Sequence, residues 1–124
     1  MPKAKDVNPK KWTNKITLYD DNVYSVCWGN FEGSLNRTMG ERWNENYPRQ
    51  GNNPTWYVTY EVFQIERINN IINLLKNAKK INNNNEYSLL NIKNEKTCVT
   101  YEEIEFFLEN CNKAMKEIEL TNNQ

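Results

Sequence analysis

The sequence predicts an α+β fold in which an N-terminal antiparallel meander of four strands precedes two amphipathic helices. Between residues 12 and 60, apolar and polar side chains alternate with the period of a β-strand. Beyond Tyr60, isoleucine and leucine recur every three or four residues, which is the period of a helix. No internal repeat or linker divides the chain, so we expect one domain over residues 1–124, with the sheet in 12–60 and the helical part in 61–120.

Residues 1–11 are expected to form a flexible arm. They contain Pro2, Pro9 and four lysines but few apolar side chains, a composition that builds little structure of its own. Such an arm is either a solvated tail or a segment that docks on a partner subunit.

Turn residues separate the four expected strands. Their bounds, in chain order, are Trp12 to the turn at residues 20–22, then residues 23–31, 35–43 and 55–60. In the third strand, alternation places Arg37 and Trp43 on one face and Arg42 on the other. Gly40 interrupts this strand, which indicates either a β-bulge or a place where another group approaches the backbone closely.

Two amphipathic helices should cover the sheet. The first has an apolar stripe of Ile65, Ile68, Ile72 and Leu75, widened by Ile71, Leu74 and Ala78. Because so broad an arc exceeds what one small sheet can cover, we expect a subunit contact in a homo-oligomer, with a two-fold dimer as the default. Thr100 and Glu103 have the spacing of a capping box at the start of the second helix, expected over residues 101–120. Residues 96–99 are compatible with one extra edge strand before it.

Composition excludes several classes of function. Lysine plus arginine and aspartate plus glutamate each total 16, so the chain lacks the positive excess of general nucleic-acid or anionic-membrane binders. It has neither an apolar run long enough to span a bilayer nor a signal peptide, and we expect a cytoplasmic protein. Three cysteines without CxxC spacing are typical of reduced thiols. Because the chain also has no histidine, almost no ligands remain for zinc or haem. We therefore expect no metal and no cofactor. The 23 asparagines are explained most simply by a genome rich in A and T.

The stretch of residues 37–60 is the candidate binding site. It concentrates three of the four arginines and two of the four tryptophans around a loop rich in Asn, Gly and Pro. Guanidinium forks bind phosphates and aromatic faces stack on planar rings. The expected ligand-binding residues are Arg37, Arg42, Trp43, Asn44, Tyr47, Arg49 and Trp56.

Each of these residues also has a simpler interpretation. The arginines are candidates for surface salt bridges, the tryptophans for core packing, and Asn44 for a turn. Because of the strand alternation, the three arginines meet only if the chain bulges at Met39 and Gly40 or turns over at Trp43.

We expect no catalytic residue and no enzymatic activity. The commonest general base is missing because the chain has no histidine. Glu41 and Glu45 flank Trp43, but their spacing does not require the two carboxylates to meet. No glycine motif for phosphates and no nucleophile elbow is present.

Residues 18–58, LYDDNVYSVCWGNFEGSLNRTMGERWNENYPRQGNNPTWYV, resemble small phage and prophage proteins of the Thoeris anti-defence sponge family. The resemblance rests on a strand ending in Tyr-Asp-Asp, an aromatic strand with Trp-Gly, the run Met-Gly-x-Arg-Trp-Asn, a Pro/Gly loop and Pro-Thr-Trp. It implies a non-enzymatic homo-oligomer that sequesters a cyclic ADP-ribose isomer made by a bacterial TIR-domain enzyme, in the cytoplasm of the infected or lysogenic host. Some members also hold cyclic oligonucleotides at separate sites.

Such a ligand is compatible with the candidate residues. Its pyrophosphate suits the three arginines, its adenine suits Trp43, Tyr47 or Trp56, and its ribose hydroxyls suit Asn44. Two alternatives remain open: a protein-contact inhibitor of a host defence protein, and a small hydrolase of the same nucleotide signal that uses Glu41 or Glu45.

Overall fold

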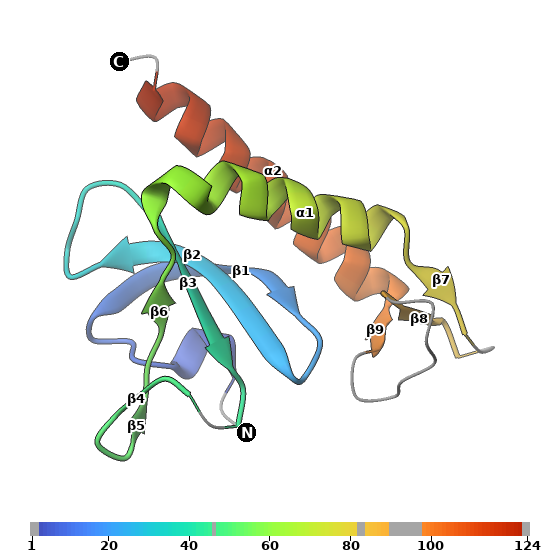
Figure 1. Cartoon of the computed structure of the whole chain (residues 1–124), viewed down its shortest axis with the longest axis horizontal. Helices are drawn as coiled ribbons and strands as arrows, with labels where there is room; N and C mark the ends of the chain where they lie inside the picture. Colours follow the sequence, from blue (N-terminus) through green and yellow to red (C-terminus); the bar gives the residue numbers. More distant parts are fainter. Residues whose placement is uncertain (1–2, 46, 82–83, 90–97, 123–124) are drawn as a thin grey trace.

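A four-stranded antiparallel sheet with two helices across one face forms the body of the protein (Figure 1). The structure is a computed structural model that describes residues 3–45, 47–81, 84–89 and 98–122. The strand order β1-β2-β3-β6 is that of a meander, and the predicted α+β fold is confirmed. The elements of this body are β1 (Trp12–Asp20), β2 (Tyr24–Phe31), β3 (Thr38–Trp43), β6 (Tyr57–Val58), α1 (Gln64–Lys76) and α2 (Tyr101–Asn122).

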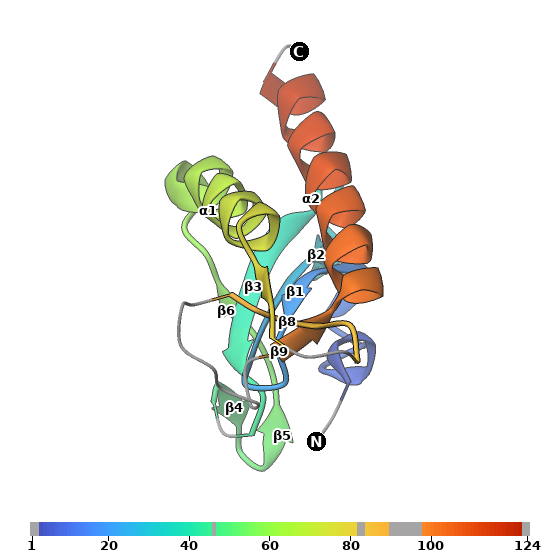
Figure 2. The same cartoon turned by 90° about the vertical axis from the view of Figure 1, so that its right-hand side faces the viewer.

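The main core lies between the sheet and the two helices, which cover the same side of it (Figure 2). Val26 and Trp28 of β2 and Met39 of β3 point into this core, as their alternation along the strands predicts. The broad apolar arc of α1 has a partner within the chain, because Ile68, Ile71 and Leu75 are all buried in the same cluster. This part of the arc therefore needs no second subunit to cover it, whereas Ile65 and Leu74 of the same arc stay exposed.

The opposite face of the sheet is covered by the N-terminal segment. Residues Ala4–Asp6 form a 3-10 helix (η1), and Val7 is buried with Trp12, Cys27 and Trp56. The indole Nε1 of Trp56 donates to the carbonyl of Val7 at 3.1 Å. The expectation of an arm with little structure is thus wrong for the described residues from Lys3 onward. Val7 between two tryptophans anchors the segment, together with the hydrogen bond from Asn8 to the Thr55 hydroxyl at 2.7 Å. Periodicity does not reveal such isolated contacts.

Gly40 marks a close approach to the backbone and not a bulge. The pairing of β2 with β3 runs without a register shift from Tyr24 opposite Trp43 to Gly29 opposite Thr38. A Cβ on Gly40 would come within 3.0 Å of the Trp12 ring and of the Cβ of Trp56. The glycine therefore lets two tryptophans pack directly on the strand.

Asparagine has a structural role at turns of this chain and at an irregularity in strand β1. Besides Glu32, the described non-glycine residues with positive φ are Asn8, Asn14, Asn22 and Asn85. Asparagine tolerates this left-handed conformation better than most residues. Part of the asparagine content is thus explained by backbone geometry, in addition to any bias of the genome.

Smaller elements complete the fold. They are β4 (Arg49–Gln50) and β5 (Asn53–Pro54), which form a hairpin in the loop between β3 and β6, the 3-10 helix η2 (Glu61–Phe63), and the three-stranded sheet of β7 (Lys79–Lys80), β8 (Glu86–Ser88) and β9 (Cys98–Thr100). The expected edge strand corresponds to β9, although residues 96 and 97 lie outside the described residues. The predicted capping box is present, since the backbone N–H of Thr100 donates to Glu103 and that of Glu103 donates to the Thr100 hydroxyl.

Candidate functional site

The seven predicted binding residues fall into three groups. Arg37 lies on the helix side of the sheet, bonded to α2. Arg42, Asn44 and Trp56 are buried. Trp43, the last residue of β3, is exposed, and so are Tyr47 and Arg49 in the segment that joins β3 to β6.

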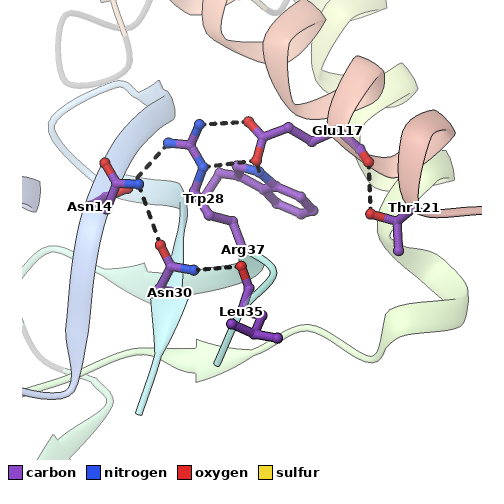
Figure 3. Close-up of polar contacts among 7 residues, drawn as sticks. All are labelled: Asn14, Trp28, Asn30, Leu35, Arg37, Glu117 and Thr121. Carbon is purple, nitrogen blue, oxygen red and sulfur yellow. Dashed lines mark hydrogen bonds and ion pairs between the residues drawn. The ribbon is translucent and has the colours of Figure 1, made fainter. Parts of the chain in front are cut away.

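Arg37 is engaged in a forked ion pair with Glu117 of α2 (Figure 3). Its Nε donates to Oε1 at 2.9 Å and its Nη2 to Oε2 at 2.6 Å, while its Nη1 donates to the carbonyl of Asn14 at 3.2 Å. Glu117 also accepts from the indole of Trp28 at 3.1 Å. This arginine therefore holds the end of α2 on the sheet, and the structure does not bring it to the other two.

Arg42 lies on the opposite face of β3 and is only 2 % exposed. It donates to the carbonyl of Thr55 at 2.6 Å and to that of Asn44 at 3.4 Å, and its Nε has no partner. Within the described part of the chain, no carboxylate forms an ion pair with it. Burial, and secondarily the positive charge of Arg49, lower the pKa of Arg42. The positive charge of Arg49 therefore acts on Arg42 across the loop.

Buried polar contacts fix both ends of the loop at residues 43–55. The side chain of Asn44 accepts from the Ser25 hydroxyl at 2.5 Å and donates to Asp20 at 3.1 Å. At the far end, the guanidinium of Arg42 binds the carbonyl of Thr55, and the next residue, Trp56, is fixed in the core. Such contacts lower the entropy that the loop loses when it binds a ligand.

The exposed part of the loop carries the groups that a ligand can reach. Trp43 is 52 % exposed and Tyr47 is 61 % exposed, and the backbone N–H of Trp43 donates to the carbonyl of Tyr47 at 2.7 Å. The edge of Trp43 packs against Tyr24, with ring centroids 4.8 Å apart. Arg49 is also exposed and donates to the carbonyl of Glu45 at 3.0 Å. Two ring surfaces and a guanidinium thus flank one fixed loop.

Glu41 belongs to a network that the sequence did not predict. It is buried and accepts hydrogen bonds from Arg67 of α1 at 2.6 Å, from the Thr59 hydroxyl at 2.6 Å and from the Tyr24 hydroxyl at 3.0 Å. Burial favours the neutral acid, but these donors outweigh it and lower the pKa of Glu41. Periodicity could not predict Arg67, because the pattern of a strand does not show which residue of a helix will meet its carboxylate.

The side chains that could serve in catalysis or metal binding lie apart or are unreactive. No hydrogen bond joins Glu41 to Glu45, which is exposed in the loop. Burial raises the pKa of the Cys27 and Cys111 thiols to about 12, which suppresses the reactive thiolate. Among the described residues, no group of three His, Cys, Asp or Glu side chains is placed to hold a metal ion.

Comparisons with known proteins identify no relative: no protein-family model, curated protein or solved structure matches this chain. In the described ranges, no helix combines the length and the apolar composition that a bilayer crossing needs.

Proposed function

We infer that this protein binds a small phosphorylated nucleotide of the cyclic ADP-ribose class at the loop of residues 43–55 and sequesters it without cleaving it. In this role it would act in the cytoplasm of a bacterial host as a phage anti-defence sponge against a TIR-dependent immune effector. The resemblance of residues 18–58 to that family supports the ligand class. The loop geometry supports the position of the site.

The observation that carries the proposal is the uncompensated charge of Arg42. A guanidinium that is 2 % exposed is costly to bury when, within the described part of the chain, its Nε has no partner and its acceptors are carbonyl groups. The nearby charge of Arg49 increases this cost. An anion bound at Arg49 would lower the potential at both guanidinium groups, and a pyrophosphate carries the charge to do so.

Exposed aromatic rings on the same loop supply the second element of nucleotide recognition in this proposal. Trp43 and Tyr47 offer ring faces on which an adenine can stack, and both belong to the same fixed loop as Arg49. The buried residues Asn44 and Trp56 contribute by holding the loop, which is a positioning role.

Sequestration is favoured over hydrolysis because the best-placed acid is already occupied. The carboxylate of Glu41 accepts from three side chains, and those donors lower its pKa. A general base needs a free acceptor site and a pKa nearer to neutrality.

The test is to incubate the protein with cyclic ADP-ribose isomers, remove unbound ligand, denature the protein by heat and identify what is released by mass spectrometry. Release of intact ligand is the expected result. Release of altered ligand would indicate a hydrolase, and no depletion of ligand would leave a protein-contact inhibitor.

Variants locate the site. Arg49→Gln should weaken ligand binding by about tenfold or more, as expected for the loss of a charged hydrogen bond. Lys76→Gln, which removes an exposed cation at the end of α1, serves as the matched control and should bind like wild type. Equal affinities for the two variants would remove Arg49 from the site.

A further inference from the structure

We propose that a groove at the other end of β3 binds a short segment of a partner protein in which an apolar side chain lies next to a lysine or arginine. The groove has a volume of about 720 Å³ and lies between the β2–β3 turn, the start of α1 and the end of α2. Its lining includes Leu35, Ile65 and Leu120 as apolar groups and Arg37, Glu61 and Glu117 as charged groups. None of these except Arg37 belongs to the nucleotide site predicted from the sequence.

The apolar rim of the groove is unusually exposed. Leu35 is 98 % exposed at the turn, and Leu120 is 66 % exposed in the last turn of α2. Ile65, at the start of α1, adds a third aliphatic side chain at 39 % exposure. Exposed leucines that gather around one concavity mark an interaction surface, whereas single ones elsewhere on a protein need no explanation.

The charge of the groove selects a cation. Arg37 and Glu117 neutralise each other in their ion pair, which leaves the carboxylate of Glu61. Among the described residues, Glu61 has no hydrogen-bond or ion-pair partner for its side chain. The C-terminal end of α2 adds partial negative charge, and its last turn contains no basic residue. A phosphorylated ligand would be repelled here, while a lysine or arginine beside an apolar anchor complements both properties.

The walls of the groove are held in place before any partner binds. Arg37 connects α2 to β1 through Glu117 and the carbonyl of Asn14, and Asn30 donates to the carbonyl of Leu35 at 3.5 Å (Figure 3). Asn30 also donates to the carbonyl of Ser34 at 2.9 Å, which fixes the turn. A preformed groove loses little conformational entropy on binding.

The experiment is a selection from an mRNA-displayed library of random dodecapeptides on the immobilised full-length protein. The expected outcome is enrichment of peptides that place Leu, Ile, Met or Phe near Lys or Arg. Their binding should fall by about tenfold or more on Leu120→Ser and on Glu61→Lys, as for loss of an anchor or of a complementary charge. Leu74→Ser, which alters another exposed leucine on α1, is the control and should bind normally.

Several results would overturn the proposal. These are the absence of enrichment, enriched peptides without a cation, or peptides that bind Leu120→Ser as tightly as wild type. Sedimentation of the wild type and of Leu35→Ser tests whether a second copy of the chain occupies the groove. A dimer in the wild type that Leu35→Ser abolishes would assign the groove to self-association and overturn the proposal. Leu35 and Leu120 are exposed, so both serine variants should fold, and circular dichroism checks this.

Discussion

Arg37 directly precedes β3 and Arg42 is its last residue but one, yet the two side chains have different partners on different faces of the sheet. Arg37 faces the helices and is matched by a carboxylate of α2 in a forked ion pair. Arg42 faces the other side of the sheet, where its partners among the described residues are carbonyl groups and the positive charge of a second arginine acts on it. The same residue type therefore closes the fold at one end of β3 and creates an unbalanced positive charge at the other.

This difference divides the surface into two regions. The loop of residues 43–55 combines positive charge with exposed aromatic rings, whereas the groove combines aliphatic side chains with negative charge. The two regions should thus select ligands of opposite charge.

The largest expected effect comes from the tryptophans of the loop region. Trp56→Ala should reduce the free energy of unfolding by about 3–5 kcal/mol, because the side chain is only 5 % exposed in the core beside Val7 and Trp12. Trp43→Ala should cost less than about 1 kcal/mol, since its ring is half exposed and packs mainly on Tyr24. Urea denaturation measures both values. Similar losses for the two variants would contradict the division of this loop into anchors and ligand-facing groups.

A smaller effect is expected for the ion pair at the groove. A double-mutant cycle with Arg37→Ala and Glu117→Ala should give a coupling energy of about 1–2 kcal/mol, reduced from the fully buried case because the Glu117 side chain is 34 % exposed. The exposed pair of Lys113 and Glu109 on α2 is the control and should couple by less than about 0.5 kcal/mol. If the two cycles give equal energies, Arg37 is a surface charge and the groove has no fixed wall.

The smallest effect concerns Tyr24, whose ring packs against that of Trp43. Burial and then the charge of Glu41 raise the pKa of Tyr24 from 10.0 to about 12. The folded state therefore holds this proton more tightly than the unfolded state, so its contribution to stability is complete below pH 10 and is lost as the pH rises towards 12. The difference in free energy of unfolding between wild type and Tyr24→Phe should shrink across that interval in urea denaturation. A constant difference would mean that folding does not raise the pKa of Tyr24.

Sequence periodicity predicted the fold because both apolar patterns act locally. The strand period of residues 12–60 corresponds to the meander, in which Val26 and Trp28 lie on the helix side, and the capping box located the start of α2. The N-terminal segment could not be predicted in this way, because its position depends on Val7 meeting Trp56 across the sheet. Fourth-strand length was also overestimated, since only Tyr57 and Val58 pair with β3.

The candidate site could be predicted by residue type but not by partner. Alternation correctly separated Arg37 from Arg42, and the continuous register at Gly40 rules out the bulge that would have united them. The ion-pair partner of Arg37 could not be predicted from a local pattern, because Glu117 lies 80 residues further along the chain. Arg67 was missed for the same reason, because its acid, Glu41, lies on another element.

The most direct test of the loop as the nucleotide site is an NMR titration of the ¹⁵N-labelled protein with cyclic ADP-ribose. The four tryptophans provide one indole N–H signal each, with Trp43 at the loop and Trp28 hydrogen-bonded beside the groove. We predict that the Trp43 signal shifts in a saturable manner while the Trp28 signal stays in place. A shift of Trp28 with Trp43 unchanged, or no shift of any indole at excess ligand, would contradict this assignment.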